Sequence, residues 1–282
     1  MGKRVGLIGD PVVHSVSPVF QQAAFDALAI AARYEAWHTP AAALAERVAG
    51  LRAPDVLGAN VTVPHKQAVV PLLDRLHPGA ARAGAVNTIV NEDGRLIGYN
   101  TDIAGFLDAL RLEGGVDPGG AWAVVIGAGG AARAVVIALV DAGVARLRVL
   151  NRTLARARAL AVELADGRVE AAALEPERAA TLLAGADLVV NCTTVGMRHS
   201  AEEHALPVPV EALPVGAMAV DLVANPLVTP FLAAAAARGC RTLGGLPMLV
   251  RQGAAAFTLW TGVPAPVPVM MAAAYRAMGA VG

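Results

Sequence analysis

A lysine and an aspartate lie among amide and hydroxyl side chains in an otherwise apolar part of the chain. They are Lys66 and Asp102, and the polar residues near them in the sequence are Asn60, Thr62 and Asn87. A lysine that follows a strand is usually a solvated surface charge. Here its neighbours are groups that hydrogen-bond to hydroxyls. The set therefore predicts a site for a hydroxylated small molecule, with an amine and a carboxylate beside it.

A glycine-rich turn lies between a continuous apolar strand and a helix. Its residues are Gly127, Ala128, Gly129, Gly130 and Ala131. Such a turn is weak evidence alone, but in this setting it is typical of dinucleotide binding. Gly127 permits a tight turn, and Gly129 lets the backbone approach a pyrophosphate. A tight strand-to-helix turn without a ligand is the alternative.

The strand after this helix ends in Asn151, Arg152 and Thr153, and Arg156 and Arg158 follow along the next helix. A NAD-preferring fold would place an acidic residue here, on the ribose 2′-hydroxyl. A cation instead fits a 2′-phosphate, which a carboxylate would repel. The segment therefore predicts NADP as the cofactor, with Arg158 more typical of a solvated helix face.

Two serines, Ser15 and Ser17, precede Pro18 and a helical run. A serine at this position is most often an N-cap. Two hydroxyls beside the N–H groups of a helix N-terminus also suit a carboxylate, which the helix dipole favours. His14 is open to either a turn or a site role. Gln252, on an apolar helix, is equally open between an interface and a site.

The expected elements place these side chains at strand ends. In the first part of the chain they are strands over 5–8 and 33–39 and up to Pro64, helices over 19–29, 41–51, 67–76 and 103–112, and a hairpin joining 89–90 to 96–97. Alternating strands and helices predict a parallel sheet covered by helices. Ligands of such sheets gather at the carboxyl ends of the strands, so the polar residues are expected to share one opening.

The second part of the chain repeats strand and helix at lengths typical of a Rossmann-like domain. The expected elements are strands over 121–126, 146–150, 187–191 and 217–223, and helices over 134–142, 248–259 and 268–278. The predicted fold class is α/β with two domains and a cleft between them. Residues 1–105 form a mixed α/β substrate domain and residues 106–245 a Rossmann-like NADP domain. The helices of 246–282 are expected to pack back near the first domain.

Composition limits the function classes. The chain has 282 residues, of which 56% are hydrophobic and 16% charged, with 23 basic and 23 acidic residues. Zero net charge gives no electrostatic sign of a nucleic-acid or membrane partner. Cys192 and Cys240 lack zinc or disulfide spacing, and no metal site is predicted. No signal peptide or span of about 18–20 apolar residues occurs, so a cytoplasmic monomer or homodimer with a small-molecule substrate is expected.

Eight motifs occur in an order and spacing that resemble the shikimate dehydrogenases. They are H-S-V-S-P at 14–18, N-V-T-V-P-H-K at 60–66, A-V-N-T at 85–88, N-T-D at 100–102, G-A-G-G-A-A-R-A at 127–134, N-R-T at 151–153, N-C-T-T-V-G-M at 191–197, and M-L-V-R-Q-G with F-T-L-W-T-G at 248–262. The resemblance covers nearly the whole chain. It implies NADP-dependent interconversion of shikimate and 3-dehydroshikimate, a step of chorismate and aromatic amino acid biosynthesis.

The resemblance also implies a role for each matching residue. Lys66 and Asp102 would be the catalytic pair, and Ser15 and Ser17 would hold the substrate carboxylate. The ring hydroxyls would be bound by Asn60, Thr62, Asn87 and Gln252. The cofactor would be bound by Gly127, Ala128, Gly129, Gly130, Ala131, Asn151, Arg152, Thr153, Arg156, Leu222 and Gly245.

Two positions depart from the family pattern. Gln21 and Gln22 replace a usual His-Asn pair, and Ala224 replaces a tyrosine that in the family contacts the substrate carboxylate. The second departure leaves open a relative that acts on quinate or another cyclic polyol acid. A non-catalytic metabolite-binding relative is a further alternative, against which the presence of both Lys66 and Asp102 argues.

Overall fold

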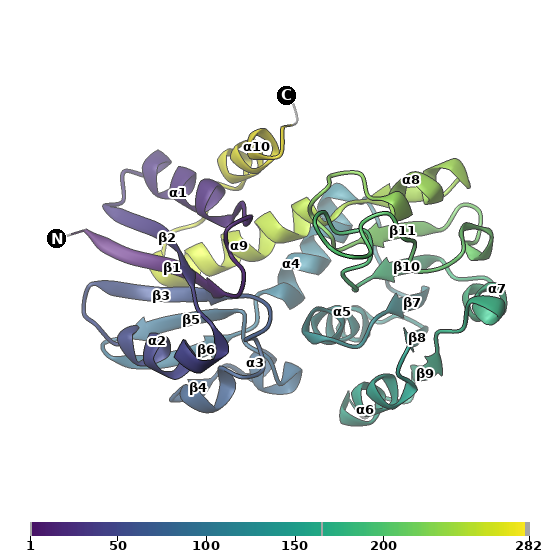
Figure 1. The fold of residues 1–282 in the computed structure, drawn as a ribbon, viewed down its shortest axis with the longest axis horizontal. Helices are drawn as coiled ribbons and strands as arrows, with labels where there is room; N and C mark the ends of the chain where they lie inside the picture. Colours follow the sequence, from purple (N-terminus) through teal and green to yellow (C-terminus); the bar gives the residue numbers. More distant parts are fainter. Residues whose placement is uncertain (1, 165, 280–282) are drawn as a thin grey trace. The chain divides into compact units, whose positions relative to one another are not determined.

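The computed structural model describes residues 2–164 and 166–279, which form two compact units. The first unit contains the chain up to Gly105 and again from Leu249, and the second runs from Phe106 to Met248. Each unit has its own six-stranded sheet (Figure 1). The predicted α/β class is confirmed. In these two described ranges, no helix has the length and apolar character needed to cross a bilayer.

The first unit is a mixed sheet with strand order β2-β1-β3-β5-β6-β4. β1, β2 and β3 are parallel, whereas β5 pairs antiparallel with both β3 and β6. The elements of its N-terminal part are β1 (Lys3–Gly9), α1 (Ser17–Ala27), β2 (Ala32–His38), η1 (Ala41–Ala43), α2 (Leu44–Gly50), β3 (Val56–Val61), η2 (Val70–Leu72), β4 (Arg75–Leu76), α3 (Pro78–Ala83), β5 (Thr88–Glu92), β6 (Arg95–Tyr99) and α4 (Asp102–Asp108).

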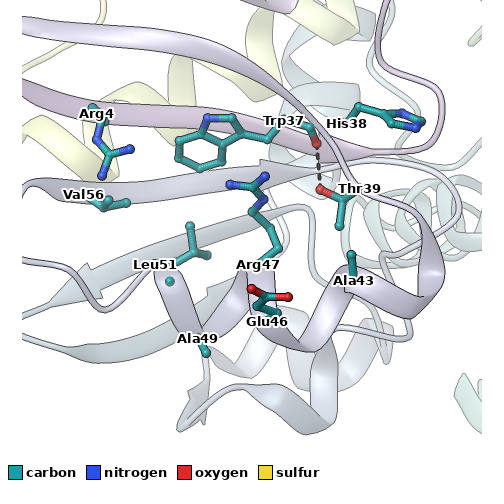
Figure 2. A pocket seen from close by; sticks show the side chains of 11 residues that line it. Arg4, Trp37, His38, Thr39, Ala43, Glu46, Arg47, Ala49, Leu51 and Val56 are labelled. Atoms are coloured by element: carbon teal, nitrogen blue, oxygen red, sulfur yellow. Dashed lines mark hydrogen bonds between the residues drawn. The ribbon is translucent and has the colours of Figure 1, made fainter.

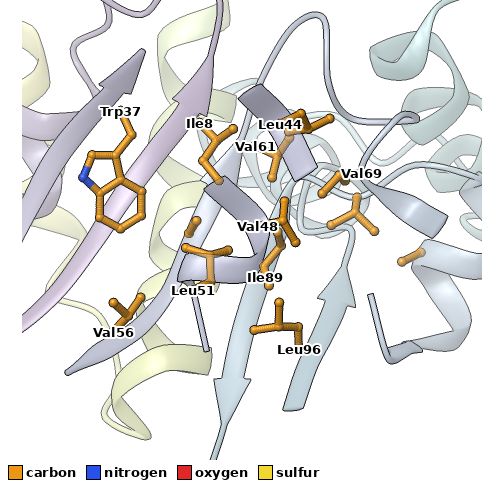
Figure 3. Packing of buried hydrophobic residues seen from close by; sticks show 13 residues of the cluster. Ile8, Trp37, Leu44, Val48, Leu51, Val56, Val61, Val69, Ile89 and Leu96 are labelled. Carbon is orange, nitrogen blue, oxygen red and sulfur yellow. The ribbon is translucent and has the colours of Figure 1, made fainter. Parts of the chain in front are cut away.

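One face of this sheet packs on α2. Ile8, Val61 and Ile89 from three strands meet Leu44 and Val48 of the helix in a cluster of buried side chains (Figure 3). Side chains of a strand alternate between faces, so the neighbouring positions point to the other side. The alternation thus separates an apolar α2 face from a face that carries polar groups.

The other face packs on α1 and on the helix α9 (Gly245–Thr261), and the C-terminal helix α10 (Val267–Ala277) packs on α1. The rings of Phe25 in α1 and Phe257 in α9 lie 4.8 Å apart between centroids. Trp260 donates from Nε1 to the carbonyl oxygen of Ile89 at 2.9 Å. The buried Gln21 donates to the carbonyl oxygen of Gly253 at 2.9 Å, so this departure from the family pattern joins α1 to α9.

One local prediction for this unit is wrong. The helix expected over 67–76 is instead a set of turns with η2 and the short strand β4, because Pro71 removes a backbone donor and interrupts a helix. The helix expected over 103–112 is confirmed, since α4 is followed directly by a π-helical turn, η3 (Ala109–Glu113). The three strands predicted before the hairpin are parallel as expected, and the hairpin adds antiparallel pairs that make the sheet mixed.

The second unit is a fully parallel sheet with order β12-β11-β10-β7-β8-β9. This is the Rossmann order, whose reversal point lies between β7 and β10. Its elements are β7 (Trp122–Ile126), α5 (Gly130–Asp141), β8 (Arg146–Asn151), α6 (Leu154–Leu164), β9 (Val169–Ala173), η4 (Pro176–Arg178), α7 (Ala179–Leu183), β10 (Leu188–Asn191), η5 (Val210–Ala212), β11 (Met218–Asp221), α8 (Pro230–Ala237) and β12 (Arg241–Leu243).

We expect Phe257→Ala to lower the free energy of unfolding of the first unit by about 3–5 kcal/mol, because the ring is fully buried and its loss leaves a cavity. Urea unfolding followed by tryptophan fluorescence measures this. Leu259→Ala on the same helix is the control, since Leu259 is 37% exposed and its loss should cost less than about 1 kcal/mol. Equal losses for the two variants would contradict the packing described.

Candidate active site

The amide of Asn87 is the centre of a buried polar network in the first unit. Its Nδ2 donates to Thr101 Oγ1 at 2.9 Å, to Asp102 Oδ1 at 2.8 Å and to Gln252 Oε1 at 3.0 Å. Its Oδ1 accepts the backbone N–H of Thr101 at 2.7 Å and the hydroxyl of Thr88 at 3.2 Å. The network therefore joins the start of β5, the start of α4 and the middle of α9.

Lys66 and Asp102 form an ion pair at the edge of this network. Lys66 Nζ lies 2.5 Å from Asp102 Oδ2, and the side chains are 19% and 6% exposed. The backbone carbonyl of Lys66 accepts the N–H of Val86 at 2.7 Å, which fixes the loop that carries the lysine. An ammonium group has three hydrogens, so the ion pair leaves two for a ligand. The predicted pair is thus brought together, with the lysine on the accessible side.

Asn60 is held by protein groups on both ends of its amide. Its Nδ2 donates to the carbonyl oxygen of Asn87 at 3.2 Å and to Thr88 Oγ1 at 3.1 Å. Its Oδ1 accepts the hydroxyl of Tyr34 at 2.8 Å, and burial raises the pKa of Tyr34, which keeps that hydroxyl protonated. Tyr34 is a site residue that the sequence analysis missed, because the pairing register that brings β2 near β3 is not visible in a local pattern.

Three hydroxyl side chains of the described residues have an unused hydrogen-bond donor. Ser17 opens α1 but is not its N-cap, which is Val16; Pro18 is accordingly the second residue of the helix. Ser15 Oγ accepts the backbone N–H of Ser17 at 3.2 Å. Among the residues that the structure describes, the hydroxyls of Ser15, Ser17 and Thr62 donate no hydrogen bond to the protein. All three retain a donor for a carboxylate or hydroxyl oxygen.

Gln252 belongs to the Asn87 network rather than to a helix interface alone. Its Oε1 accepts from Asn87, and its Nε2 donates to the carbonyl oxygen of Leu249 at 2.7 Å. One amide hydrogen remains for a ligand, since each NH₂ group carries two. A glycine is required nearby, because a Cβ on Gly105 would lie 2.6 Å from the backbone nitrogen of Gln252. His14, the other residue left open by the sequence, is exposed.

The glycine turn of the second unit has the geometry of an anion cradle. Gly127 has φ of 113° and donates its N–H to the carbonyl oxygen of Leu150 at 2.7 Å. A Cβ on Gly127 would lie 3.2 Å from the carbonyl oxygen of Cys192. Gly129 is the N-cap of α5 and supplies no side-chain cap, so N–H groups of the first helical turn are available to a phosphate.

A cavity of about 150 Å³ lies beside this turn, bordered by the ends of β7 and β8. Asn151 and Arg152 line one part of it, and Thr193 and Glu202 line another. Asn151 donates from Nδ2 to the carbonyl oxygen of Thr153 at 2.9 Å. Over residues 2–164 and 166–279, Arg156 makes no side-chain hydrogen bond or ion pair. The cavity thus has one cation, Arg152, in its wall beside Gly127, whereas Arg156 does not line it.

A buried Asn–Asp pair holds Thr193, which lines this cavity. Asn191, at the end of β10, donates to Asp221 Oδ1 at 3.0 Å and accepts the N–H and hydroxyl of Thr193 at 3.1 and 2.7 Å. Asp221 Oδ2 also accepts the hydroxyl of Thr229 at 2.6 Å. Burial raises the pKa of Asp221 to about 6, although its hydrogen bonds act in the opposite direction. The sequence analysis did not single out Asp221 or Asn191 as functional.

The two remaining cofactor candidates lie against each other. Gly245 opens α9, and a Cβ there would lie 2.4 Å from the carbonyl oxygen of Leu222. Glycine is therefore required for the backbone after β11 to approach the helix this closely. Ala224, which follows, is half-buried.

A larger hollow of about 600 Å³ lies elsewhere in the first unit, between α2 and the edge strand β2. In it the guanidinium of Arg47 lies 5.5 Å from the centre of the Trp37 ring, with Thr39 nearby (Figure 2). None of the predicted site residues lines this hollow. Across the described ranges, no group of three or more His, Cys, Asp or Glu side chains is arranged to hold a metal ion.

Together the Rossmann-ordered sheet, its glycine turn and the Lys66–Asp102 pair define an oxidoreductase of the dinucleotide-dependent class. Three family models match the chain. They are described as the shikimate dehydrogenase substrate binding domain over residues 7–89, shikimate/quinate 5-dehydrogenase over residues 117–226, and the shikimate 5′-dehydrogenase C-terminal domain over residues 245–275.

Known proteins give the same result. The NADP(+) shikimate dehydrogenase of Moorella thermoacetica is 51% identical over 98% of this chain and 94% of its own. The structure of Thermus thermophilus shikimate 5-dehydrogenase with NADP(H) and shikimate matches with a TM-score of 0.88 and 44% identity, over 98% and 99% of the two chains. Corynebacterium glutamicum quinate dehydrogenase with NAD matches with a TM-score of 0.86 and 33% identity, over 96% and 98%. The chain belongs to the shikimate dehydrogenase family.

We expect Asp221→Asn to change the pH dependence of stability. The folded-state pKa of Asp221 is raised from 3.8 to about 6, so the folded protein binds this proton more tightly than the unfolded chain. The associated stability is complete below about pH 4 and is lost as pH rises through about 6, by about 2–3 kcal/mol in all.

The variant cannot titrate at this position. Its free energy of unfolding, relative to that of wild type, should therefore rise between pH 4 and pH 7 by about the same 2–3 kcal/mol. Urea unfolding at several pH values measures the difference, in which the other carboxyl groups cancel. A difference that stays constant with pH would contradict the raised pKa.

Proposed function

We propose that this protein is an NADP-dependent shikimate dehydrogenase, which reversibly reduces 3-dehydroshikimate to shikimate in chorismate and aromatic amino acid biosynthesis. The observation that carries the proposal is the Lys66–Asp102 pair, fixed to the Asn87 network and open to a ligand at Lys66 Nζ. In this proposal the first unit binds the substrate and the second unit binds NADP. NADP, when bound, accepts or supplies the hydride.

In this proposal Lys66 acts on the oxygen of the reacting alcohol or ketone, through the proton or the negative charge of that oxygen. Oxidation of an alcohol leaves a proton on that oxygen to be removed, and reduction of a ketone requires one to be supplied. Lys66 Nζ either exchanges this proton or remains charged and stabilises the developing negative oxygen. Asp102 orients the lysine, because its Oδ2 lies 2.5 Å from Lys66 Nζ. Asp102 is itself oriented by Asn87.

The choice of lysine over arginine supports the proton-exchange role. The chain has only two lysines, Lys3 and Lys66, and its other basic residues are arginines. A guanidinium group cannot be deprotonated in a protein, whereas an ammonium group can. A position that needed only a fixed positive charge would be served by arginine, which the rest of the chain uses almost exclusively.

The substrate is positioned by the open donors around Lys66. The hydroxyls of Ser15 and Ser17, at the N-terminus of α1, bind its carboxylate, and Thr62 binds a ring hydroxyl. Asn60, Asn87 and Gln252 line the same site, but their amides are largely engaged with protein groups. We therefore assign Asn60 and Asn87 mainly to holding the site in shape, with Gln252 retaining a free hydrogen for the substrate.

The second unit fits the adenosine end of NADP. The turn from Gly127 to Ala131 holds the pyrophosphate at the N-terminus of α5. Arg152 and Arg156, with Asn151 and Thr153, bind the 2′-phosphate. Leu222 and Gly245 complete the nucleotide-binding set, since their backbones meet after β11. A cytoplasmic location and a monomeric or dimeric state stay predictions.

Ala224 makes the choice of cyclic acid the main alternative. The family pattern places there a tyrosine that contacts the substrate carboxylate, and a quinate dehydrogenase is among the structural matches. Ser15 and Ser17 remain as carboxylate ligands in this chain. We therefore keep shikimate as the substrate, with quinate or another polyol acid as the second candidate.

We expect kcat/KM to be highest for shikimate with NADP. Formation of reduced nicotinamide, followed by absorbance, compares shikimate and quinate with NADP and NAD in all four combinations. Faster turnover of quinate than of shikimate would contradict the proposed substrate. Faster turnover with NAD than with NADP would contradict the proposed cofactor. No turnover in any combination would favour a metabolite-binding protein without catalytic activity.

Lys66→Ala should lower kcat by about 10²–10⁴-fold, the usual contribution of a general acid–base group. Lys66→Arg distinguishes the two roles of the lysine. It should be nearly as impaired if Lys66 exchanges a proton, and should keep most of the activity if only positive charge is needed. Lys3→Ala is the matched control, because Lys3 is exposed and its Nζ donates to the carbonyl oxygen of Pro54, away from the predicted site residues. Full activity of Lys66→Ala would disprove a catalytic role.

A further inference from the structure

The cavity proposed for the adenosine 2′-phosphate is lined by a carboxylate as well as by the cation Arg152. Glu202 lines it together with Gly127, and its Oε1 lies 3.2 Å from Arg152 Nη1. Glu202 is separated from Arg152 by fifty positions in the sequence. The acidic residue that is missing at the end of β8 is therefore supplied to the same cavity by a different loop.

The backbone holds Glu202 in this place. Its N–H donates to Ser200 Oγ at 3.3 Å, and its carbonyl oxygen accepts the N–H of Gly196 at 2.9 Å. Gly196 has φ of 87°, a conformation that favours glycine. Leu206 and Pro207, a few residues on, line the cavity as well. The carboxylate thus belongs to a loop that is fixed at the cavity wall.

The Arg152–Glu202 contact is weak, so a ligand can replace Glu202 as the partner of Arg152. The two side chains are 77% and 41% exposed, and the contact joins one nitrogen to one oxygen. Exposed ion pairs of this kind contribute little to stability. A phosphate carries a charge of about −1.5 to −2 at neutral pH and can take two parallel hydrogen bonds from a guanidinium. A 2′-phosphate would therefore displace Glu202 from Arg152.

A ribose without the 2′-phosphate requires a hydrogen-bond acceptor instead of a cation. Its 2′-hydroxyl is a donor, and a carboxylate is the acceptor that NAD-binding Rossmann domains place on it. Glu202 would accept that hydroxyl while remaining paired with Arg152. One carboxylate thus opposes the phosphate and favours the hydroxyl.

We propose that Glu202 is a specificity-determining residue of the nucleotide site: it competes with the 2′-phosphate for Arg152 and lowers the preference for NADP over NAD. This inference rests on the proposed function, since it assigns the cavity to the nucleotide's adenosine end. It predicts that the natural preference for the phosphorylated nucleotide is smaller than Arg152 alone would give.

The test compares binding of adenosine 2′,5′-bisphosphate and of 5′-AMP by titration calorimetry. The measured quantity is the ratio of their dissociation constants in wild type, Glu202→Gln, Arg152→Gln and the double variant. Glu202→Gln should increase the preference for the bisphosphate by about fivefold, the order of magnitude for one exposed ion pair. Arg152→Gln should reduce the preference, and adding Glu202→Gln to it should restore little.

Glu211→Gln is the matched control, because it removes one exposed negative charge from the same unit at a position outside the cavity. The ratio of the two dissociation constants in Glu211→Gln should equal that in wild type. An unchanged ratio in Glu202→Gln, or a full fivefold effect without Arg152, would overturn the competition proposed.

The inference and the proposed function fail in different ways. A wild type that prefers the bisphosphate and turns over with NADP, with Glu202→Gln unchanged, would overturn the inference alone. A wild type that binds neither nucleotide would overturn both. Binding without any turnover of shikimate or quinate, with the expected ratios, would support the role of Glu202 and contradict the proposed activity.

Discussion

The buried amide of Asn87 constrains the candidate active site more than any other group described. Each of its polar atoms is paired, and the partners come from β5, α4 and α9. A buried donor or acceptor left without a partner costs about 1–3 kcal/mol, so the three segments are held to one arrangement. Lys66 receives its orientation through this arrangement, because Asp102 bonds Asn87 with one oxygen and Lys66 with the other.

The second unit contains a similar buried Asn–Asp pair, but its aspartate does not face a cation. Asn191 binds Asp221 through Nδ2 and the backbone N–H of Thr193 through Oδ1, as Asn87 does with Asp102 and Thr101. Asp102 faces a cation, whereas the side-chain and backbone groups that donate to Asp221 are neutral. Burial without a counter-charge raises the pKa of Asp221. One carboxylate is thus suited to orient a lysine, and the other to support a cavity wall.

The features that depend on hydrophobic periodicity and local backbone preference were predicted from the sequence. The apolar strands, the Asp-Gly hairpin and the glycine turn follow from periodicity and backbone preference, and they were predicted within a few residues. The helix predicted over 67–76 does not form, because Pro71 interrupts the helical hydrogen bonds that the apolar residues around it would allow. Tyr34 and Glu202 were missed for another reason. Each reaches its partner across a distance in sequence that only strand order and loop path determine, and neither follows from residue spacing.

The nucleotide cavity shows why such long-range partners change a chemical argument. The segment after β8 predicts a phosphate site because it offers cations and lacks a carboxylate. The cavity that the fold builds contains the carboxylate of Glu202 beside the same arginine. A ligand responds to the summed field of the cavity rather than to one segment, and exposed charges at this distance partly cancel. Cofactor preference in a Rossmann-like unit therefore follows from the pairing of residues across loops.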